Sequence, residues 1–220
     1  MSDRMISGCG THDPAETELT HAMLSRGMIC VTNRALCQED FLTRIEQLAK
    51  AHPAAILLRE KDLSKEAYGE LAKKVLCICK TYDTLCILHN YADAAYTLHH
   101  PALHLPLPVL RRLSETEHRS YQILGASCHS VEDAMEAEAL GCTYITAGHI
   151  FDTDCKKGMP GRGLQFLRDV CSLVSIPVYA IGGISPENYS SVKEAGAAGA
   201  CIMSSAMTCE ATDSYLASFL

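Results

Sequence analysis

The amino-acid sequence predicts an α/β fold, a single (β/α)8 TIM barrel over residues 28–220 behind a short N-terminal extension, residues 1–27. The length of 220 residues suits one domain of that size. Short apolar runs alternate with longer amphipathic segments, and the runs lack polar alternation, as is typical of parallel strands buried on both faces. An open doubly wound sheet is the alternative, but no G-x-G-x-x-G motif follows the first run.

The N-terminal extension has two interpretations. Leu19, Met23 and Arg26 follow helical spacing, which favours a short amphipathic helix packed on the main body. A partly disordered leader is the other interpretation. After the extension, apolar runs predict eight strands, at residues 28–32, 54–58, 85–88, 102–105, 121–125, 143–147, 177–181 and 199–203.

Helical signals between these runs are clearest in four places. Two are amphipathic repeats, formed by Phe41, Ile45 and Leu48 and, behind the N-cap candidate Ser64, by Tyr68, Leu71, Val75 and Cys79. A third is Ser130 with Asp133, which resembles a capping box. The fourth is Ser185-Pro186, which opens a helix that Gly196 ends. The segments 91–99 and 108–113 are short and give weaker helical signals.

Composition excludes several classes of function. The formal net charge is −7 and no basic run occurs, so we expect no nucleic-acid partner. No stretch is long and apolar enough to span a bilayer, so we expect no membrane partner. The 12 cysteines are scattered through predicted strands and helices without a zinc spacing. With no signal-peptide pattern, they indicate a reducing cytoplasm.

Polar residues gather where the predicted strands end, which is the site-bearing edge of such a barrel. Gly182, Gly183 and Ser204 each precede a helical segment, so we interpret them as a phosphate site rather than as tight turns alone. Lys156 lies in a long glycine-containing loop that is either a cationic lid or a solvated charged loop. The other predicted ligand contacts from this edge are Arg59, Lys61, Asn90, Ser127, Thr153 and Cys155.

His149 is the catalytic candidate, because it follows a strand-end glycine and an imidazole exchanges protons near neutral pH. His129 and His104 are secondary candidates that also suit the pocket wall or the core. No close pair of carboxylates follows the third or fourth predicted strand, and Mg²⁺ bound to a diphosphate usually needs one or two. The residues therefore favour a phosphate ligand over a metal-bound diphosphate.

In order along the chain, several motifs resemble the thiamin phosphate synthase superfamily: residues 58–62, 89–90, 104–105, 125–130, 148–158, 180–184 and 203–204. The resemblance implies a (β/α)8 barrel of thiamin biosynthesis with one of two activities. One branch is an Mg²⁺-dependent synthase that joins a pyrimidine diphosphate to a thiazole phosphate. The other, the TenI type, is a metal-independent thiazole tautomerase.

The chain departs from the synthase pattern in three places. An aspartate is expected after Asn90, where Tyr91 stands. A His-x-Gly-Gln-x-Asp run is expected at the fourth strand, where His104 is followed by Leu105-Pro106-Leu107. Leu57 occupies the position ahead of Arg59 where the synthase pattern has glutamine. By contrast, residues 148–163 closely resemble the tautomerase branch, whose proposed acid/base matches His149.

We therefore predict a thiazole tautomerase that uses no cofactor and no metal and acts on a small phosphorylated thiazole. By resemblance, Gly182, Gly183, Ser204 and Lys156 hold the phosphate, and Thr153 and Cys155 line the thiazole. The alternatives are the Mg²⁺-dependent synthase and a non-catalytic regulatory protein that binds a thiazole or thiamin phosphate. The sequence is also compatible with a homodimer.

Overall fold

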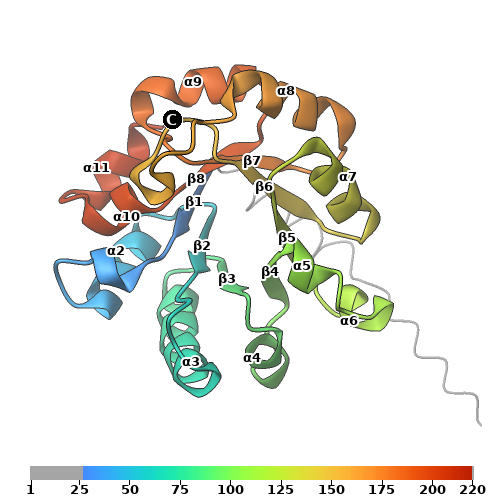
Figure 1. The fold of residues 1–220 in the computed structure, drawn as a ribbon. Helices are drawn as coiled ribbons and strands as arrows, with labels where there is room; N and C mark the ends of the chain where they lie inside the picture. Colours follow the sequence, from blue (N-terminus) through green and yellow to red (C-terminus); the bar gives the residue numbers. More distant parts are fainter. Residues whose placement is uncertain (1–26, 220) are drawn as a thin grey trace, which may run out of the picture.

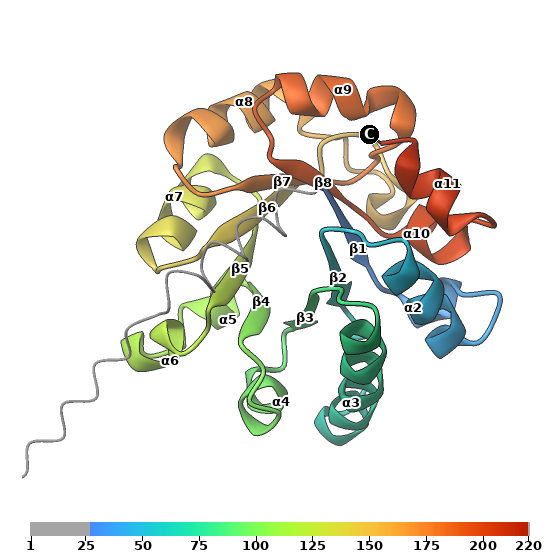
Figure 2. The same ribbon diagram turned by 180° about the vertical axis from the view of Figure 1, so that it is seen from behind.

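The computed structural model describes residues 27–219, so the proposed N-terminal helix and its alternative lie outside the described residues. Eight parallel strands form a closed barrel in sequence order, with helices around the outside (Figures 1 and 2). The predicted fold class is confirmed. The strands are β1 (Met28–Val31), β2 (Ala55–Leu58), β3 (Cys86–His89), β4 (Ala102–Pro106), β5 (Ile123–Cys128), β6 (Tyr144–Gly148), β7 (Val178–Ile181) and β8 (Gly199–Ile202).

The connections carry the helices and short 3-10 turns. In order these are η1 (Arg34–Leu36), α2 (Phe41–Lys50), α3 (Lys65–Thr81), α4 (Ala92–Thr97), α5 (Leu107–Leu110), α6 (Glu115–Arg119), α7 (Val131–Ala139), η2 (Asp154–Lys156), α8 (Gly163–Leu173), α9 (Pro186–Glu194), α10 (Ser204–Thr208) and α11 (Thr212–Ala217). Of the two segments with weak helical signals, residues 91–99 contain α4, and residues 108–113 contain all of α5 but its first residue.

β5 begins and ends later than predicted. The apolar run suggested residues 121–125, but the strand runs from Ile123 to Cys128. Tyr121 belongs to the core outside the barrel. Ser127 remains in the strand because it pairs with Pro106 of β4 and Thr146 of β6. A polar residue is tolerated there because the upper end of the barrel interior opens into a pocket.

Two apolar cores flank the strands, as expected for strands buried on both faces. The larger lies between the barrel and its helices. The smaller fills the barrel and includes Tyr144 and Tyr179, whose rings meet edge to face at 5.9 Å. Residues two apart along a strand share a face, so the strand ends continue this inner face upward into polar side chains.

The local signals at the helix starts had mixed outcomes. Ser64 caps α3, accepting from the Ala67 N–H at 3.2 Å. Ser130 caps α7, but the predicted capping box is wrong, because the Asp133 carboxylate accepts from the His129 N–H at 2.8 Å instead of from Ser130.

The start and end predicted for α9 are confirmed. Ser185 is the N-cap and Pro186 the first helical residue. Gly196 follows the end of the helix at φ +100°, a conformation that glycine adopts readily.

Within residues 27–219 all the cysteines are free, as the sequence predicted for a reducing environment. Among the helices of the same residues, none combines the length and apolar character needed to cross a bilayer. The cytoplasmic location and the homodimer stay predictions.

Candidate active site

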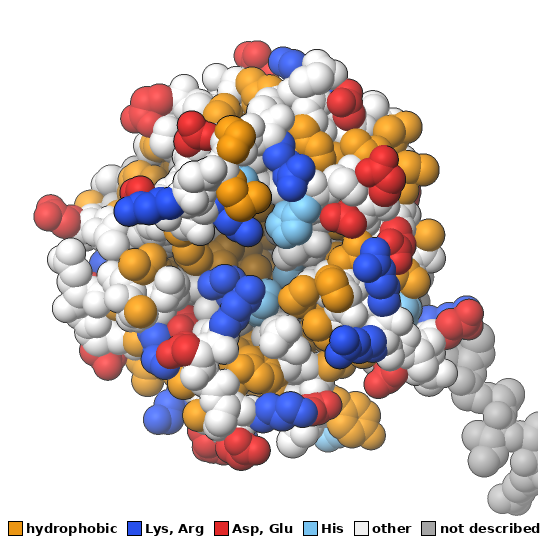
Figure 3. Space-filling view, in the orientation of Figure 1, with side chains coloured by type: hydrophobic (Ala, Val, Ile, Leu, Met, Phe, Trp, Pro, Cys, Tyr) orange, Lys and Arg blue, Asp and Glu red, His pale blue; other side chains and the backbone are white. Residues whose placement is uncertain are grey.

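A pocket of about 520 Å³ opens at the carboxyl ends of the strands. Figure 3 shows this face, where basic and histidine side chains surround a hollow. The lining includes every predicted site residue except Asn90: Arg59, Lys61, Ser127, His149, Thr153, Cys155, Lys156, Gly182, Gly183 and Ser204. The full lining draws on the carboxyl ends of all eight strands, which thus converge on one cavity.

Asn90 is the predicted residue that the structure places outside the lining. It follows β3 at φ +69°, and its N–H donates to the His104 carbonyl at 3.0 Å. His89 lines the pocket instead. The reason is the two-residue period of a strand, because His89 shares the inner face with Ile87, whereas Asn90 does not.

His149 lies immediately after the end of β6 and is 8% exposed. Its Nε2 lies 3.1 Å from the Met159 carbonyl oxygen, which belongs to the loop between β6 and α8. A carbonyl only accepts, so Nε2 carries the proton and the neutral ring has its lone pair on Nδ1. Within residues 27–219 no side chain or backbone group bonds to that Nδ1. His149 therefore has the form of a general base with its acceptor nitrogen free.

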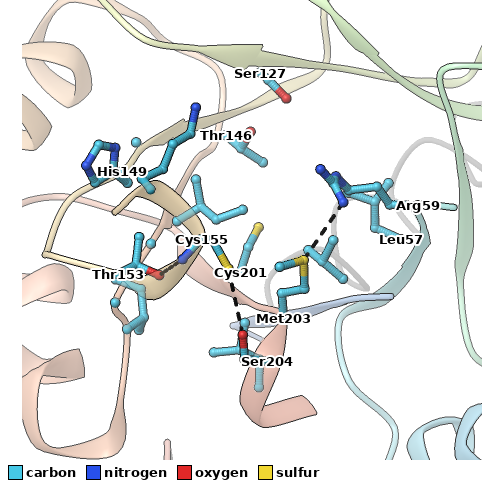
Figure 4. Close-up of a pocket in the computed structure, with 18 of the residues that line it drawn as sticks. Leu57, Arg59, Ser127, Thr146, His149, Thr153, Cys155, Cys201, Met203 and Ser204 are labelled. Atoms are coloured by element: carbon cyan, nitrogen blue, oxygen red, sulfur yellow. Dashed lines mark hydrogen bonds between the residues drawn. The ribbon is translucent and has the colours of Figure 1, made fainter. Parts of the chain in front are cut away.

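Glycine at position 182 makes room for His149. Gly182 has φ +98°, and a Cβ there would lie 2.3 Å from His149 Cβ. The backbone around the imidazole is also held in place, since the Arg162 N–H donates to the His149 carbonyl at 2.9 Å. Figure 4 shows His149 and Arg59 on opposite sides of the pocket.

The predicted phosphate residues lie together. Gly183 has φ +68°, and a Cβ there would lie 2.5 Å from the Asp152 carbonyl oxygen, so the close approach of these loops requires glycine. α10 begins at Ser204, and the N–H groups of its first turn lack partners within the helix. The Cys155 thiol lies 3.8 Å from the Ser204 hydroxyl (Figure 4). Together with Lys156, these groups can bind an anion.

Three cationic side chains, Arg59, Lys61 and Lys156, line the cavity. Burial, together with the positive charges of Arg59 and Lys156, lowers the pKa of Lys61. Among the described residues, no aspartate or glutamate lines the pocket. The cavity is therefore electropositive although the whole chain has a net charge of −7.

Arg59 is anchored by a network that the sequence did not reveal. Its backbone N–H donates to the Thr32 hydroxyl at 2.9 Å, and that hydroxyl donates to Glu60 Oε1 at 2.6 Å. The Arg34 N–H also donates to the Glu60 carboxylate, at 3.1 Å. Glu60 is 2% exposed, and burial raises its pKa. These contacts join the carboxyl ends of β1 and β2, which lie side by side because the two strands pair in parallel.

The pocket floor contains two stacked imidazoles, His89 and His104, with ring centroids 5.8 Å apart. Burial, with added repulsion from His104, Arg59 and Lys61, lowers the pKa of His89 to about 2. Burial lowers the pKa of His104 to about 3. Both rings are therefore neutral at physiological pH. His129, the other secondary candidate, donates from Nδ1 to the Gly148 carbonyl at 2.9 Å and also lines the pocket.

The lining does not fit Mg²⁺. The residues described contain no group of three or more His, Cys, Asp or Glu side chains arranged to hold a metal ion. Magnesium prefers carboxylate oxygens, and the motif positions that would carry them, beyond β3 and β4, hold Tyr91 and Val109. The donors present match a phosphorylated organic anion instead.

The fold and this pocket define a (β/α)8 barrel with an anion-binding site at the carboxyl ends of its strands. The family model described as thiamine monophosphate synthase, TMP-TENI, matches residues 28–206. The chain therefore belongs to this family, which confirms the resemblance that its motifs indicated.

Relatives cover most of the chain. The "Thiamine-phosphate synthase 2" of Streptococcus pneumoniae serotype 4 is 33% identical over 196 residues, which is 86% of this chain and 91% of the relative. The "Putative thiamine-phosphate synthase 2" of Aquifex aeolicus is 34% identical over 177 residues, 78% of this chain and 92% of the relative. A solved thiamine phosphate pyrophosphorylase from Pyrococcus furiosus superposes with a TM-score of 0.77 at 27% identity, covering 90% of this chain and 95% of its own. These names favour the synthase alternative over the predicted tautomerase.

Proposed function

We propose that this protein is a thiazole tautomerase of thiamin biosynthesis, which shifts a proton without a metal and so aromatises a thiazole carboxylate phosphate. The observation that carries the proposal is the composition of the pocket. It combines a histidine whose acceptor nitrogen is free with three cations and, among the described residues, no lining carboxylate. Such a set suits proton transfer on an anionic substrate.

The substrate is held at both ends. Gly182, Gly183, Ser204 and Lys156 bind the phosphate through N–H groups, a hydroxyl and a charge. Arg59 and Lys61 supply positive charge for the carboxylate. Ser127, Thr153 and Cys155 line the ring, whereas Asn90, predicted as a further contact, lies outside the lining.

His149 moves the proton. Its Nδ1 lone pair removes the acidic ring hydrogen, and the electrons shift towards the exocyclic double bond. The resulting imidazolium keeps its Nε2–H bonded to the Met159 carbonyl, so the ring stays oriented while it carries the proton. The same proton is then delivered to the exocyclic carbon, so substrate and product are isomers. A positioned acid/base of this kind contributes about 10²–10⁴-fold in rate.

The second candidate is the Mg²⁺-dependent synthase, which the names of the relatives favour. A diphosphate with Mg²⁺ needs carboxylate ligands, and the described lining offers none, so we derive no step through the metal. The third candidate, a regulatory protein that only binds the thiazole phosphate, shares the pocket but needs no base.

One variant separates these functions. His149→Asn should lower thiazole tautomerisation, followed by ultraviolet absorbance, by about 10²-fold or more, because the general base is lost. Binding of the aromatic thiazole carboxylate phosphate, measured by calorimetry, should persist. The control is His99→Asn, since His99 is exposed at φ +49°, a conformation that asparagine tolerates.

Three outcomes contradict the proposal. Full turnover by His149→Asn removes His149 from the base role. Formation of thiamin phosphate by the native protein from the pyrimidine diphosphate, the thiazole phosphate and Mg²⁺ assigns the synthase instead. Binding without tautomerisation by the native protein assigns a regulatory role.

A further inference from the structure

Beneath the pocket, three side chains from neighbouring strands form a hydrogen-bonded series. The Tyr144 hydroxyl of β6 lies 2.9 Å from His104 Nδ1 of β4. His104 Nε2 lies 2.9 Å from the Ser127 hydroxyl oxygen of β5. Tyr144 is 0% exposed, His104 is 1% exposed and lies on the pocket floor, and Ser127 lines the pocket (Figure 4). The series therefore runs from the barrel core to the ligand cavity.

The sequence makes room for this series with a glycine. Gly125 of β5 lies beside both rings, and a Cβ there would come within 2.3 Å of the Tyr144 ring and 2.5 Å of His104 Nδ1. Both rings are buried in a closely packed interior, so a side chain at position 125 would have to displace them. The contact between Tyr144 and His104 thus depends on the absence of a side chain at position 125.

The direction of the hydrogen bonds follows from the partners. Within residues 27–219, His104 Nδ1 is the one polar partner of the Tyr144 hydroxyl, which otherwise lies among apolar side chains. A buried O–H left without an acceptor costs about 1–3 kcal/mol, so Tyr144 donates to Nδ1. Desolvation raises the pKa of Tyr144, so the hydroxyl keeps its proton.

The rest of the series is then determined. Neutral His104 has one ring proton, and because Nδ1 accepts, that proton is on Nε2. The Nε2–H donates to the Ser127 oxygen, so the Ser127 O–H has no acceptor on His104. Since Ser127 lines the pocket, its proton is directed to whatever the pocket holds.

We propose that Tyr144 and His104 are positioning residues that make the Ser127 hydroxyl a hydrogen-bond donor to an acceptor atom of the bound ligand. A thiazole carboxylate phosphate presents acceptor oxygens, so a fixed donor favours it over a ligand that presents an N–H or O–H at that point. The identity of this ligand rests on the proposed function, whereas the direction of the series does not.

The direction can be measured without a ligand. The full chain is labelled with ¹⁵N-histidine, and the His104 signals are assigned by their loss in His104→Gln. We expect a neutral ring protonated on Nε2 near pH 7. In Tyr144→Phe the ring should lose this single form, because Nδ1 no longer has a donor. A native His104 protonated on Nδ1 would overturn the proposal, whether or not the protein is a tautomerase.

The consequence for the ligand is tested by a double-mutant cycle. Calorimetry with thiazole carboxylate phosphate should show about 10-fold weaker binding to Ser127→Ala, as expected for a lost bond to a charged acceptor. Tyr144→Phe should weaken binding by a similar or smaller factor, and the double variant should bind no more weakly than Ser127→Ala. Additive losses would mean that Tyr144 acts independently of Ser127, which contradicts the proposal.

Tyr179→Phe is the control for removing a hydroxyl from the barrel interior, and it should keep native affinity. If the native protein binds no thiazole phosphate, the proposed function fails, and the histidine spectrum still confirms or refutes the positioning role.

Discussion

Replacing Gly182 with alanine should both destabilise the barrel and displace the proposed base. The new Cβ would lie 2.3 Å from His149 Cβ and 2.8 Å from His149 Cα, and carbon atoms rest about 3.5–4.0 Å apart. Relief of this overlap requires a shift of more than about 1 Å. Overpacking of a tight site costs about 1–3 kcal/mol. The positive φ of +98° adds about 1–2 kcal/mol for a residue with a Cβ.

The total of about 2–5 kcal/mol corresponds to a fall in Tm of roughly 4–20 °C, since a chain of this size loses about 2–4 °C per kcal/mol. Turnover should fall by about 10²-fold, the usual effect of misplacing a catalytic group by 1 Å. Calorimetric unfolding and the absorbance assay measure the two effects.

The matched control for this variant is Gly141→Ala. Gly141 has φ +86°, but a Cβ there would meet no heavy atom within 4 Å, so this variant isolates the backbone contribution. It should lower Tm by a smaller amount and leave turnover unchanged. If Gly182→Ala matches Gly141→Ala in both Tm and turnover, the reasoning that glycine makes room for His149 is refuted.

Two further predictions concern stability. His89 and His104 have lowered pKa values in the folded chain, about 2 and about 3, so below pH 6.5 the unfolded chain binds more protons and stability falls as pH falls. Each histidine should lower the free energy of unfolding by about 2 kcal/mol between pH 7 and pH 5. In urea unfolding, His104→Gln should therefore reduce the difference in stability between the two pH values by about 2 kcal/mol. An unchanged difference would show that His104 is not neutral when folded. Thr32→Val deprives the Arg59 N–H of its acceptor, so it should lower the free energy of unfolding in urea by about 1–3 kcal/mol and weaken ligand binding. The control is Thr97→Val at an exposed position, which should change the free energy of unfolding by under about 0.5 kcal/mol. Equal effects of the two threonine variants would argue against the anchoring of Arg59.

The barrel was predictable because burial on both faces leaves a clear signal. Each strand appeared as an apolar run, and the observed bounds differ by a residue or two except at β5. There the run of apolar residues stopped at Gly125, while the strand continued through Ser127. Strand residues that face the pocket can be polar, as Ser127 is, so a strand end predicted from its apolar run alone can fall short of the true end near the site.

The same effect explains why the structure places Asn90 outside the pocket lining. The motif after β3 directed attention to Asn90, but the strand includes His89, which takes the inward position. The spacing of Ile87 and His89 by two residues was a usable signal, had the strand been extended by one residue. The anchoring of Arg59 by Thr32 and Glu60 was not predictable, because it joins residues 27 or 28 apart whose side chains meet only once β1 and β2 have paired.

The charge of the pocket bears directly on the choice between the two activities of this family. A diphosphate brought in with Mg²⁺ is largely neutralised, and its metal still needs oxygen ligands from the protein. A carboxylate phosphate has no metal and needs cationic partners at two points. Arg59, Lys61 and Lys156 line the pocket as cations. The pKa of Lys61 is lowered by burial and then by repulsion from Arg59 and Lys156, and a bound anion would offset that repulsion. The electrostatics of the described residues therefore favour the tautomerase substrate, even though the names of the relatives favour the synthase.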